Sequence, residues 1–143
     1  MSVRVTAEAP VNPTEDEAKV QRALLNIFPD AKTERLSKSD SLVILKLEGS
    51  GFEFLSTLRS LIKQERIRTA ARKVMMLNIQ GEHVTIHLHK QAAFVGRISF
   101  CESEGESPLG PISIKIITNN LESVIDYLAA RPGQDGFQRF RET

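Results

Sequence analysis

The chain has little of what usually marks a secreted or membrane protein. Cys101 is its single cysteine, so no internal disulfide can form, which suits a reducing compartment. No hydrophobic run approaches the length of a membrane span, and the first residues, MSVRVTAEA, lack the apolar segment of a signal peptide. We therefore expect a cytoplasmic protein that is not bound to a membrane.

Neither sign of charge is in excess, because 19 Lys and Arg face 18 Asp and Glu, for a formal net charge of +1. The whole chain is therefore not basic enough to indicate nucleic acid, and any such signal must come from local clustering. At 143 residues, 41% of them hydrophobic, the chain is long enough to bury a core. We expect one α+β domain over residues 1–131, followed by a polar tail over 132–143.

Motifs of known catalytic and metal sites are also missing. The chain has neither a Walker loop nor a G-x-G-x-x-G run. His87 and His89 could offer two imidazoles to one metal, but no Cys-x-x-Cys and no clear further ligands accompany them. Cys101 paired with a histidine could act as a nucleophile, although a lone cysteine at a strand end is far more often inert packing. We expect no catalytic site, no metal and no cofactor, and thus a protein that is not an enzyme.

What the sequence does contain is alternation of apolar and polar residues, most clearly around residues 83–101. Val84, Ile86 and Leu88 alternate with polar residues, and a second alternating run covers 94–101. The four residues between the runs, 90–93, are short enough to form a turn. This pattern predicts an antiparallel hairpin with an apolar face under the helices. Its polar face is expected to carry His83, Thr85, His87, His89, Arg97 and Ser99, with Lys115 from a later strand.

Further strands are expected at residues 3–9 and 112–116, and as a pair within 31–47 around the polar break at 38–40. Leu42 and Ile44 are apolar on the face opposite Val43, Leu45 and Leu47. A strand that is apolar on both faces is typical either of the centre of a sheet or of a dimer interface.

Three helical regions are expected between these strands. The first follows a capping box, Thr14 to Glu17, and ends at Pro29. The second covers 52–78, where the apolar stripe weakens at 64–66, which predicts two helices or a kink. A short helix over 121–130 comes last. The fold class expected is α+β, a mostly antiparallel sheet with helices packed on one face.

Basic residues are concentrated in one part of the chain, between residues 59 and 73, where Glu65 is the only acid. Six of them occur there: Arg59, Lys63, Arg66, Arg68, Arg72 and Lys73. On a continuous helix, four of the six share a face, and such a row can follow a phosphate backbone. A kink near Glu65 would split the row, although both halves could still border one surface. An ordinary solvated helix face is the alternative interpretation.

Short motifs occur in a fixed order over nearly the whole chain: Pro13-Thr14-Glu15-Asp16, Ile27-Phe28-Pro29, Arg72, Lys90-Gln91-Ala92-Ala93 with Gly96, and Ser107-Pro108-Leu109-Gly110-Pro111-Ile112. In these motifs the chain resembles a small archaeal family of uncharacterised proteins to which RNA binding is attributed. The family usually has Asn where this chain has His89. The resemblance implies an RNA-linked role and a fold like the ribosomal protein that holds the smallest ribosomal RNA of the large subunit.

Together, the basic stretch and the resemblance predict a non-catalytic RNA-binding module that contacts structured RNA mainly through phosphates. Lys90 and Gln91, at the expected hairpin tip, are the motif positions most free to contact a ligand. Stacking on bases is not expected, because Phe94 and Phe100 fall on the apolar face. The alternative is a structural or interaction protein that acts as a homodimer without binding nucleic acid. The residues expected to contact RNA are Arg59, Lys63, Arg66, Arg68, Arg72, Lys73, Lys90, Gln91 and Arg97.

Overall fold

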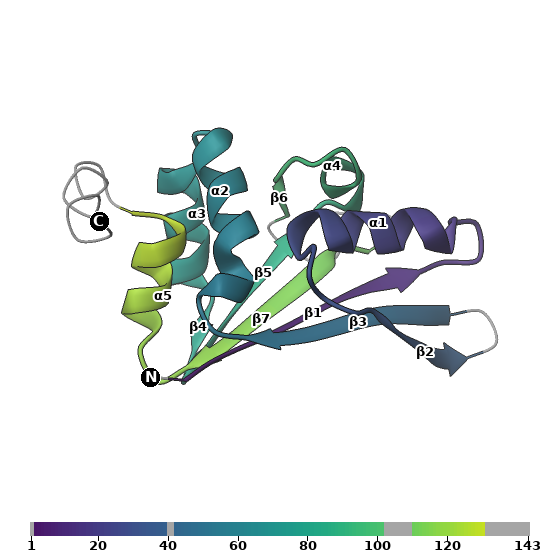
Figure 1. The fold of residues 1–143 in the computed structure, drawn as a ribbon, viewed down its shortest axis with the longest axis horizontal. Coiled ribbons are helices and arrows are strands. Elements are labelled where there is room, and N and C mark those ends of the chain that lie inside the picture. Colours follow the sequence, from purple (N-terminus) through teal and green to yellow (C-terminus); the bar gives the residue numbers. More distant parts are fainter. Residues whose placement is uncertain (1, 40–41, 102–109, 131–143) are drawn as a thin grey trace.

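The computed structural model describes residues 2–39, 42–101 and 110–130. In it, one antiparallel sheet is covered on a single face by helices, as the sequence predicts (Figure 1). The expected loop over 102–110 lies almost entirely outside the described residues, and the expected C-terminal tail lies wholly outside them.

The sheet has seven strands in the order β2-β3-β1-β7-β5-β4, with β6 added to β5, and every pairing is antiparallel. The N-terminal strand lies in the middle, where Ala7 pairs with Leu47 of β3 and Ile114 of β7. The strands are β1 (Val3–Val11), β2 (Glu34–Ser39), β3 (Leu42–Ser50), β4 (Ile79–Gln80), β5 (His83–Leu88), β6 (Phe100–Cys101) and β7 (Ile112–Thr118).

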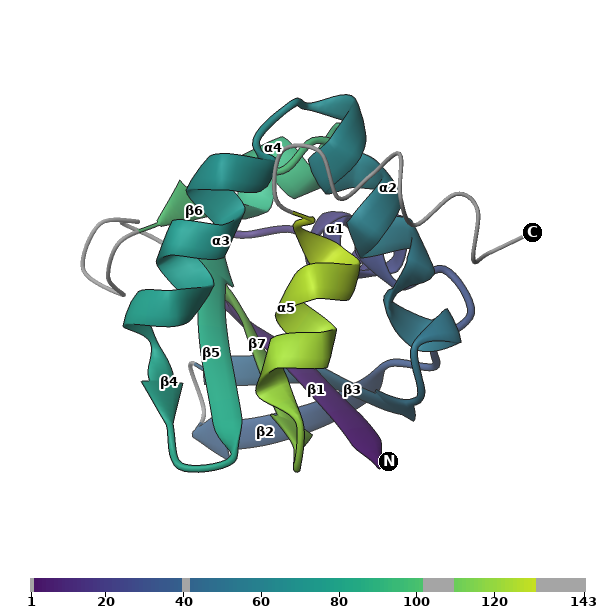
Figure 2. The same ribbon diagram turned by 90° about the vertical axis from the view of Figure 1, so that its left-hand side faces the viewer.

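The helices form two groups over the same face of the sheet. One group packs side by side over one end, and the other lies across the opposite end (Figures 1 and 2). The first group is α2 (Ser56–Gln64), which follows a short 3-10 turn at Glu53–Leu55, α3 (Arg68–Leu77) and α5 (Leu121–Leu128). The second is α1 (Glu17–Ile27) with the short α4 (Lys90–Phe94).

The core lies between the sheet and these helices. Alternate residues of each central strand point into it, as period-two patterning requires, and residues such as Val84, Ile86 and Ile114 are at most 1% exposed. On the helix side, the rings of Phe28 and Phe54 stack with their centroids 5.0 Å apart. The core therefore confirms the apolar faces predicted for β1, β5 and β7.

Within the described ranges, no helix covers the opposite face of the sheet, which carries polar side chains in cross-strand rows. Thr85 of β5 and Thr6 of β1 both pair with Lys115 of β7. His87 of β5 lies 2.9 Å from the Ser113 hydroxyl of β7, measured from Nδ1 to Oγ. The prediction of a polar outer face is thus confirmed for β5 and β7.

The start of α1 differs from the prediction of a capping box led by Thr14. Asp16 is the N-cap, and its carboxylate accepts a hydrogen bond from the Ala18 amide at 3.0 Å. The preceding residues form a turn closed by a hydrogen bond from the Glu15 amide to the Asn12 carbonyl at 2.9 Å. Because that turn includes Thr14, the helix begins two residues later than the capping pattern indicates.

The predicted interruption of the stretch 52–78 is confirmed. Arg66 separates α2 from α3 and has a positive φ of 59°. Its amide donates to Lys63 O at 3.1 Å, and the Ile67 amide donates to Ile62 O at 3.2 Å. This pair of bonds is the usual left-handed ending of a helix, with arginine where glycine is most common.

The second half of the predicted hairpin, 94–101, is wrong. Residues 90–94 form α4, and only Phe100–Cys101 pairs with β5. Gly96, with φ of 78°, ends the helix: its amide donates to Ala93 O, and the Arg97 amide donates to Ala92 O. Ile98 is still buried, at 6% exposed, but Arg97 does not lie on the sheet.

Candidate nucleic-acid interface

Two of the six clustered basic residues hold α5 in place. Arg59 Nε donates to the Tyr127 carbonyl at 3.0 Å, and its guanidinium lies 4.9 Å from the centre of the Tyr127 ring. Arg72 Nη1 donates to Asp126 Oδ1 at 2.7 Å and to the Ala129 carbonyl at 3.1 Å. These carbonyls belong to the last turn of α5 and the residue after it, where helical partners run out. Arg59 and Arg72 therefore have a structural task that the sequence did not reveal.

Three other basic residues gather where α2 meets α3. Lys63, Arg66 and Arg68 line one open hollow of about 440 Å³, which Thr69 and Ala130 complete. Lys63 and Arg66 are exposed and Arg68 is half-buried. The break at Arg66 does not scatter the basic row, because it turns the end of α2 and the start of α3 toward one site. Lys73 is exposed farther along α3 and does not line this hollow.

Arg97, in the loop after α4, does not line this hollow but is held next to the α2–α3 connection by Glu65. Its Nη2 and Nε lie 3.0 and 3.1 Å from the two carboxylate oxygens of Glu65, in a two-pronged ion pair. The hydrogen bond from Arg97 is the main cause that holds the pKa of Glu65 below its ordinary value. Because the Arg97 side chain stays 68% exposed, it still faces solvent beside α2. We call Lys63, Arg66, Arg68 and Arg97 the basic corner.

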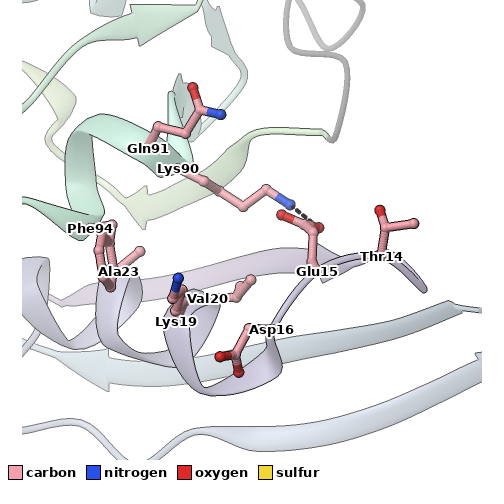
Figure 3. A pocket seen from close by; sticks show the side chains of 9 residues that line it. All are labelled: Thr14, Glu15, Asp16, Lys19, Val20, Ala23, Lys90, Gln91 and Phe94. Atoms are coloured by element: carbon pink, nitrogen blue, oxygen red, sulfur yellow. Dashed lines mark hydrogen bonds and ion pairs between the residues drawn. The ribbon is translucent and has the colours of Figure 1, made fainter.

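The position predicted for Lys90 is wrong. It begins α4 instead of forming a hairpin tip, and its side chain is only 8% exposed. Its ammonium group donates to the Pro10 carbonyl at 2.7 Å and to Glu15 Oε1 at 2.8 Å, as Figure 3 shows for the ion pair. The helix turns Lys90 inward because α4 packs on α1, whereas its neighbour Gln91 is exposed.

Glu15 is held as a carboxylate by several donors. Burial raises the pKa of Glu15, but the backbone amide of Asn12, the Lys90 ammonium and the Asn12 side chain together hold that pKa below its ordinary value. The Asn12 donors reach Oε1 at 3.0 Å from the amide and 2.9 Å from Nδ2. The ion pair is thus well satisfied although both side chains are buried.

This ion pair borders a second open hollow, of about 380 Å³, which the sequence did not predict (Figure 3). We call it the α1–α4 hollow. Asn26 of α1 fixes its two walls by donating to the carbonyls of Ala93 and Phe94 at 2.9 and 3.0 Å. The hollow is lined by Thr14, Glu15, Asp16, Lys19, Val20, Ala23, Lys90, Gln91 and Phe94.

The sequence did hold a signal for this hollow, because two of the motifs that carry the family resemblance form its walls. Glu15 belongs to the first motif and Lys90 to another, 75 residues later. A third motif also reaches this region: Gly110 has φ of 85°, and a Cβ there would lie 2.6 Å from Pro10 Cγ. The motifs therefore meet in space near Pro10, which a linear reading could not show.

Within residues 2–39, 42–101 and 110–130, no group of three His, Cys, Asp or Glu side chains is placed to hold a metal ion. Over the same residues, no helix is long and apolar enough to cross a membrane.

Comparison with known proteins identifies the family. The model of a family described as RNA binding matches residues 4–119. A UPF0201 protein of Aeropyrum pernix is 48% identical over 128 residues, which are 89% of this chain and 85% of that protein. One from Metallosphaera sedula is 39% identical over 90% of this chain and 88% of its own length. The chain belongs to this RNA-binding family.

Solved structures share the fold. A UPF0201 protein from Methanococcus jannaschii superposes with a TM-score of 0.79 at 30% identity, covering 90% of this chain and 93% of that one. Mth689 from Methanothermobacter thermautotrophicus, 19% identical, shares the fold with a TM-score of 0.60 over 90% of this chain and 99% of its own. The expected likeness to a ribosomal protein stays a prediction.

Proposed function

We propose that the chain is a non-catalytic RNA-binding module that contacts structured RNA mainly through phosphates at the basic corner. One observation carries this proposal: the α2–α3 connection brings Lys63, Arg66 and Arg68 to one hollow, and Arg97 is paired with Glu65 beside it, in a chain whose net charge is only +1. The described family function, RNA binding, supports it independently.

The chemistry of the basic corner suits phosphate. Arginine presents several N–H donors in a planar fork, and lysine adds a compact positive charge, so both pair well with phosphate oxygens. The end of α2, the start of α3 and the Arg97–Glu65 ion pair hold the basic corner at fixed spacing, which matches the fixed phosphate spacing of a folded RNA better than that of a flexible strand. Contacts of this kind release counterions, so binding weakens as salt rises.

The backbone of Arg66 supports a functional role for that side chain. Arginine in the left-handed region is strained compared with glycine. Such strain often accompanies a functional site, where the side chain contributes something that glycine cannot. At Arg66 the contribution we propose is a positive charge at the tip of the α2–α3 connection.

Salt dependence of binding is the direct test. If about four side chains meet phosphates, the slope of log affinity against log salt is expected to be about −3 to −4. The double reversal Lys63→Glu/Arg66→Glu should weaken binding to every structured RNA tested and flatten the slope by about 2. The measurement is titration of fluorescently labelled hairpin and single-stranded RNA at several salt concentrations.

The matched control is Arg22→Glu/Lys32→Glu, which reverses one arginine and one lysine at exposed positions of α1 and the segment before β2. This control changes the net charge by the same amount and should leave the salt slope within error of the unmodified protein. If the control weakens binding as much as the test variant, overall charge accounts for the effect and the basic corner does not. Absence of binding to either RNA at low salt would overturn the proposal.

A further inference from the structure

The α1–α4 hollow has the build of a ligand site, and the phosphate contacts proposed above do not use it. Its volume of about 380 Å³ falls within the range usual for small-ligand sites. Val20, Ala23 and Phe94 form its apolar part, while the buried ion pair of Glu15 and Lys90 forms a polar wall. Asn26 ties α1 to α4, so the hollow is formed before any ligand arrives.

The charges around the hollow balance. Glu15 and Lys90 neutralise each other, at 2.8 Å and with side chains 12% and 8% exposed. The other two charged residues of the lining, Asp16 and Lys19, also have opposite signs. A phosphate group is best bound by net positive charge and a metal cation by net negative charge. The hollow therefore favours a neutral ligand.

Phe94 adds an aromatic surface to this neutral hollow. Lys19 Nζ lies 5.8 Å from the centre of the Phe94 ring, as a cation over an aromatic face. The prediction that Phe94 lies on the apolar face of a strand is wrong, since it ends α4 and lines the hollow. A half-buried ring beside polar groups can stack on a flat ligand when the exposed Lys19 side chain moves aside.

Hydrogen-bonding groups line other parts of the same hollow. The three hydrogen bonds from Asn12 and Lys90 to Glu15 all end on Oε1. Among the described residues, its second carboxylate oxygen accepts none, so it can accept from a ligand N–H. Gln91 lies at the rim on the α4 side, where its amide offers both a donor and an acceptor (Figure 3).

We propose that the α1–α4 hollow binds one unpaired nucleobase, stacked on Phe94 and hydrogen-bonded along its edge by Glu15 and Gln91. A nucleobase is flat and neutral, with an apolar face and polar edges, which is the combination that the lining offers. The inference rests on the proposed function, because RNA supplies the base. It adds base preference to binding through phosphates.

Ribonucleosides test the hollow without phosphate. Adenosine, guanosine, cytidine and uridine are titrated separately into the isotope-labelled full chain, and backbone amide signals are followed by NMR. At least one nucleoside should shift the amides of residues 14–23 and 90–94, and inorganic phosphate should not shift them. If none of the four nucleosides shifts these amides at millimolar concentration, the inference is overturned.

Two substitutions at one position separate stacking from packing. Phe94→Tyr keeps the ring and should bind the preferred nucleoside as the unmodified chain does. Phe94→Leu keeps an apolar side chain but no ring, and should weaken that binding about tenfold, within the usual range for loss of one stacked base. Equal binding by both variants would overturn the inference. Thermal midpoints of both variants show whether a loss of binding reflects unfolding.

Gln91→Ala is a second test at an exposed position, where substitutions usually change stability little. It should reduce the difference in affinity between the preferred base and the other three, because an edge contact is lost. An unchanged preference among the four bases would show that Gln91 does not hydrogen-bond to the edge of the base, which contradicts that part of the proposal.

The two proposals fail in different ways. If RNA binding is salt-sensitive but unaffected by Phe94→Leu, and no nucleoside shifts the amide signals, the proposal of a nucleobase site is overturned. The proposal of phosphate contacts at the basic corner then stands. Nucleoside shifts without binding to any RNA overturn the proposed function and support the hollow as a nucleobase site. Loss of RNA affinity in Lys63→Glu/Arg66→Glu, with nucleoside shifts unchanged, supports both.

Discussion

Arg66 is, within the described part of the chain, the only non-glycine residue with a positive φ, at 59°. A residue with a Cβ costs about 1–2 kcal/mol in that region of backbone space. The hydrogen bonds that close α2 require that conformation. Any residue other than glycine at position 66 therefore carries this strain. Stability and binding thus place opposite demands on this residue.

The substitution Arg66→Gly should separate these demands. We expect the free energy of unfolding to rise by roughly 0.5–1 kcal/mol, because relief of the left-handed strain exceeds the extra entropy that glycine gives the unfolded chain. RNA affinity should fall at the same time, with the salt slope shallower by about 1. Urea denaturation and RNA titration measure the two effects.

Arg66→Ala serves as the control, since it removes the charge and keeps the strain. It should lose RNA affinity like the glycine variant without the gain in stability. A glycine variant less stable than the unmodified chain would show that the arginine side chain itself stabilises the connection between the helices.

Among the secondary-structure elements, the short helix α4 is anchored at its first residue by a buried ion pair. It has only five residues, too few for a helix that stands alone, and Lys90 at its first position reaches Glu15 and the Pro10 carbonyl. The pair links the short helix to the connection between β1 and α1. Removing one partner would leave a buried charge without compensation.

We therefore expect Lys90→Met to lower the free energy of unfolding by about 3–5 kcal/mol, measured by urea denaturation at neutral pH. Lys73→Met is the matched control, because Lys73 is exposed on α3, and it should change stability by at most about 0.5 kcal/mol. Similar small losses in the two variants would mean that Glu15 finds other donors when Lys90 is absent.

The secondary structure also shows where sequence reasoning worked. Strict alternation marked β1, β5 and β7, and the weak apolar stripe near Arg66 marked the break between α2 and α3. The run 94–101 alternates too, yet the chain forms α4 and then a left-handed ending at Gly96. Alternation over a few residues cannot outweigh a helix that packs on α1 and a glycine that ends it.

The candidate site could be predicted only in outline. The sequence shows six basic residues close together, but their direction depends on partners far along the chain. Arg72 meets Asp126 and Arg59 meets Tyr127, 54 and 68 residues away. These contacts direct both arginine side chains to α5, whereas the ion pair with Glu65 holds Arg97 at the basic corner. Contacts between residues so far apart in the sequence leave no local sequence pattern from which they could be predicted.

For the whole molecule, the depressed pKa values of Glu15 and Glu65 link stability to pH. A carboxyl group whose pKa is lower in the folded state than in the unfolded state stabilises the fold above its unfolded pKa, near 4.3. That stabilisation is lost as pH falls through the folded-state value. Stability is therefore expected to be retained from pH 7 to 5 and to decline below pH 5.

Urea denaturation at pH 7, 5 and 3 tests this expectation. The unmodified chain should lose more stability between pH 5 and 3 than the variant Glu15→Gln, in which the buried carboxyl group cannot titrate. Parallel curves for the two proteins would show that other carboxyl groups dominate the acid response.

Over the described residues, helices cover one face of the sheet and leave the other face without helices (Figure 1). β3, whose two apolar faces raised the expectation of a dimer, is an inner strand between β2 and β1. Leu42 and Ile44 are half-buried in the single chain. An inner position is one of the two explanations for such a strand, so a homodimer is not required and stays a prediction.

The central position of the N-terminal strand has a consequence for how the protein is made. β1 leaves the ribosome before β7, which pairs with one of its edges and follows only after roughly 100 further residues, about 5–20 s of translation. Throughout that interval, the nascent chain presents an incomplete sheet edge on which other chains could add. Completion of the sheet must therefore wait until β7 has been synthesised, even though β1, its central strand, is made long before.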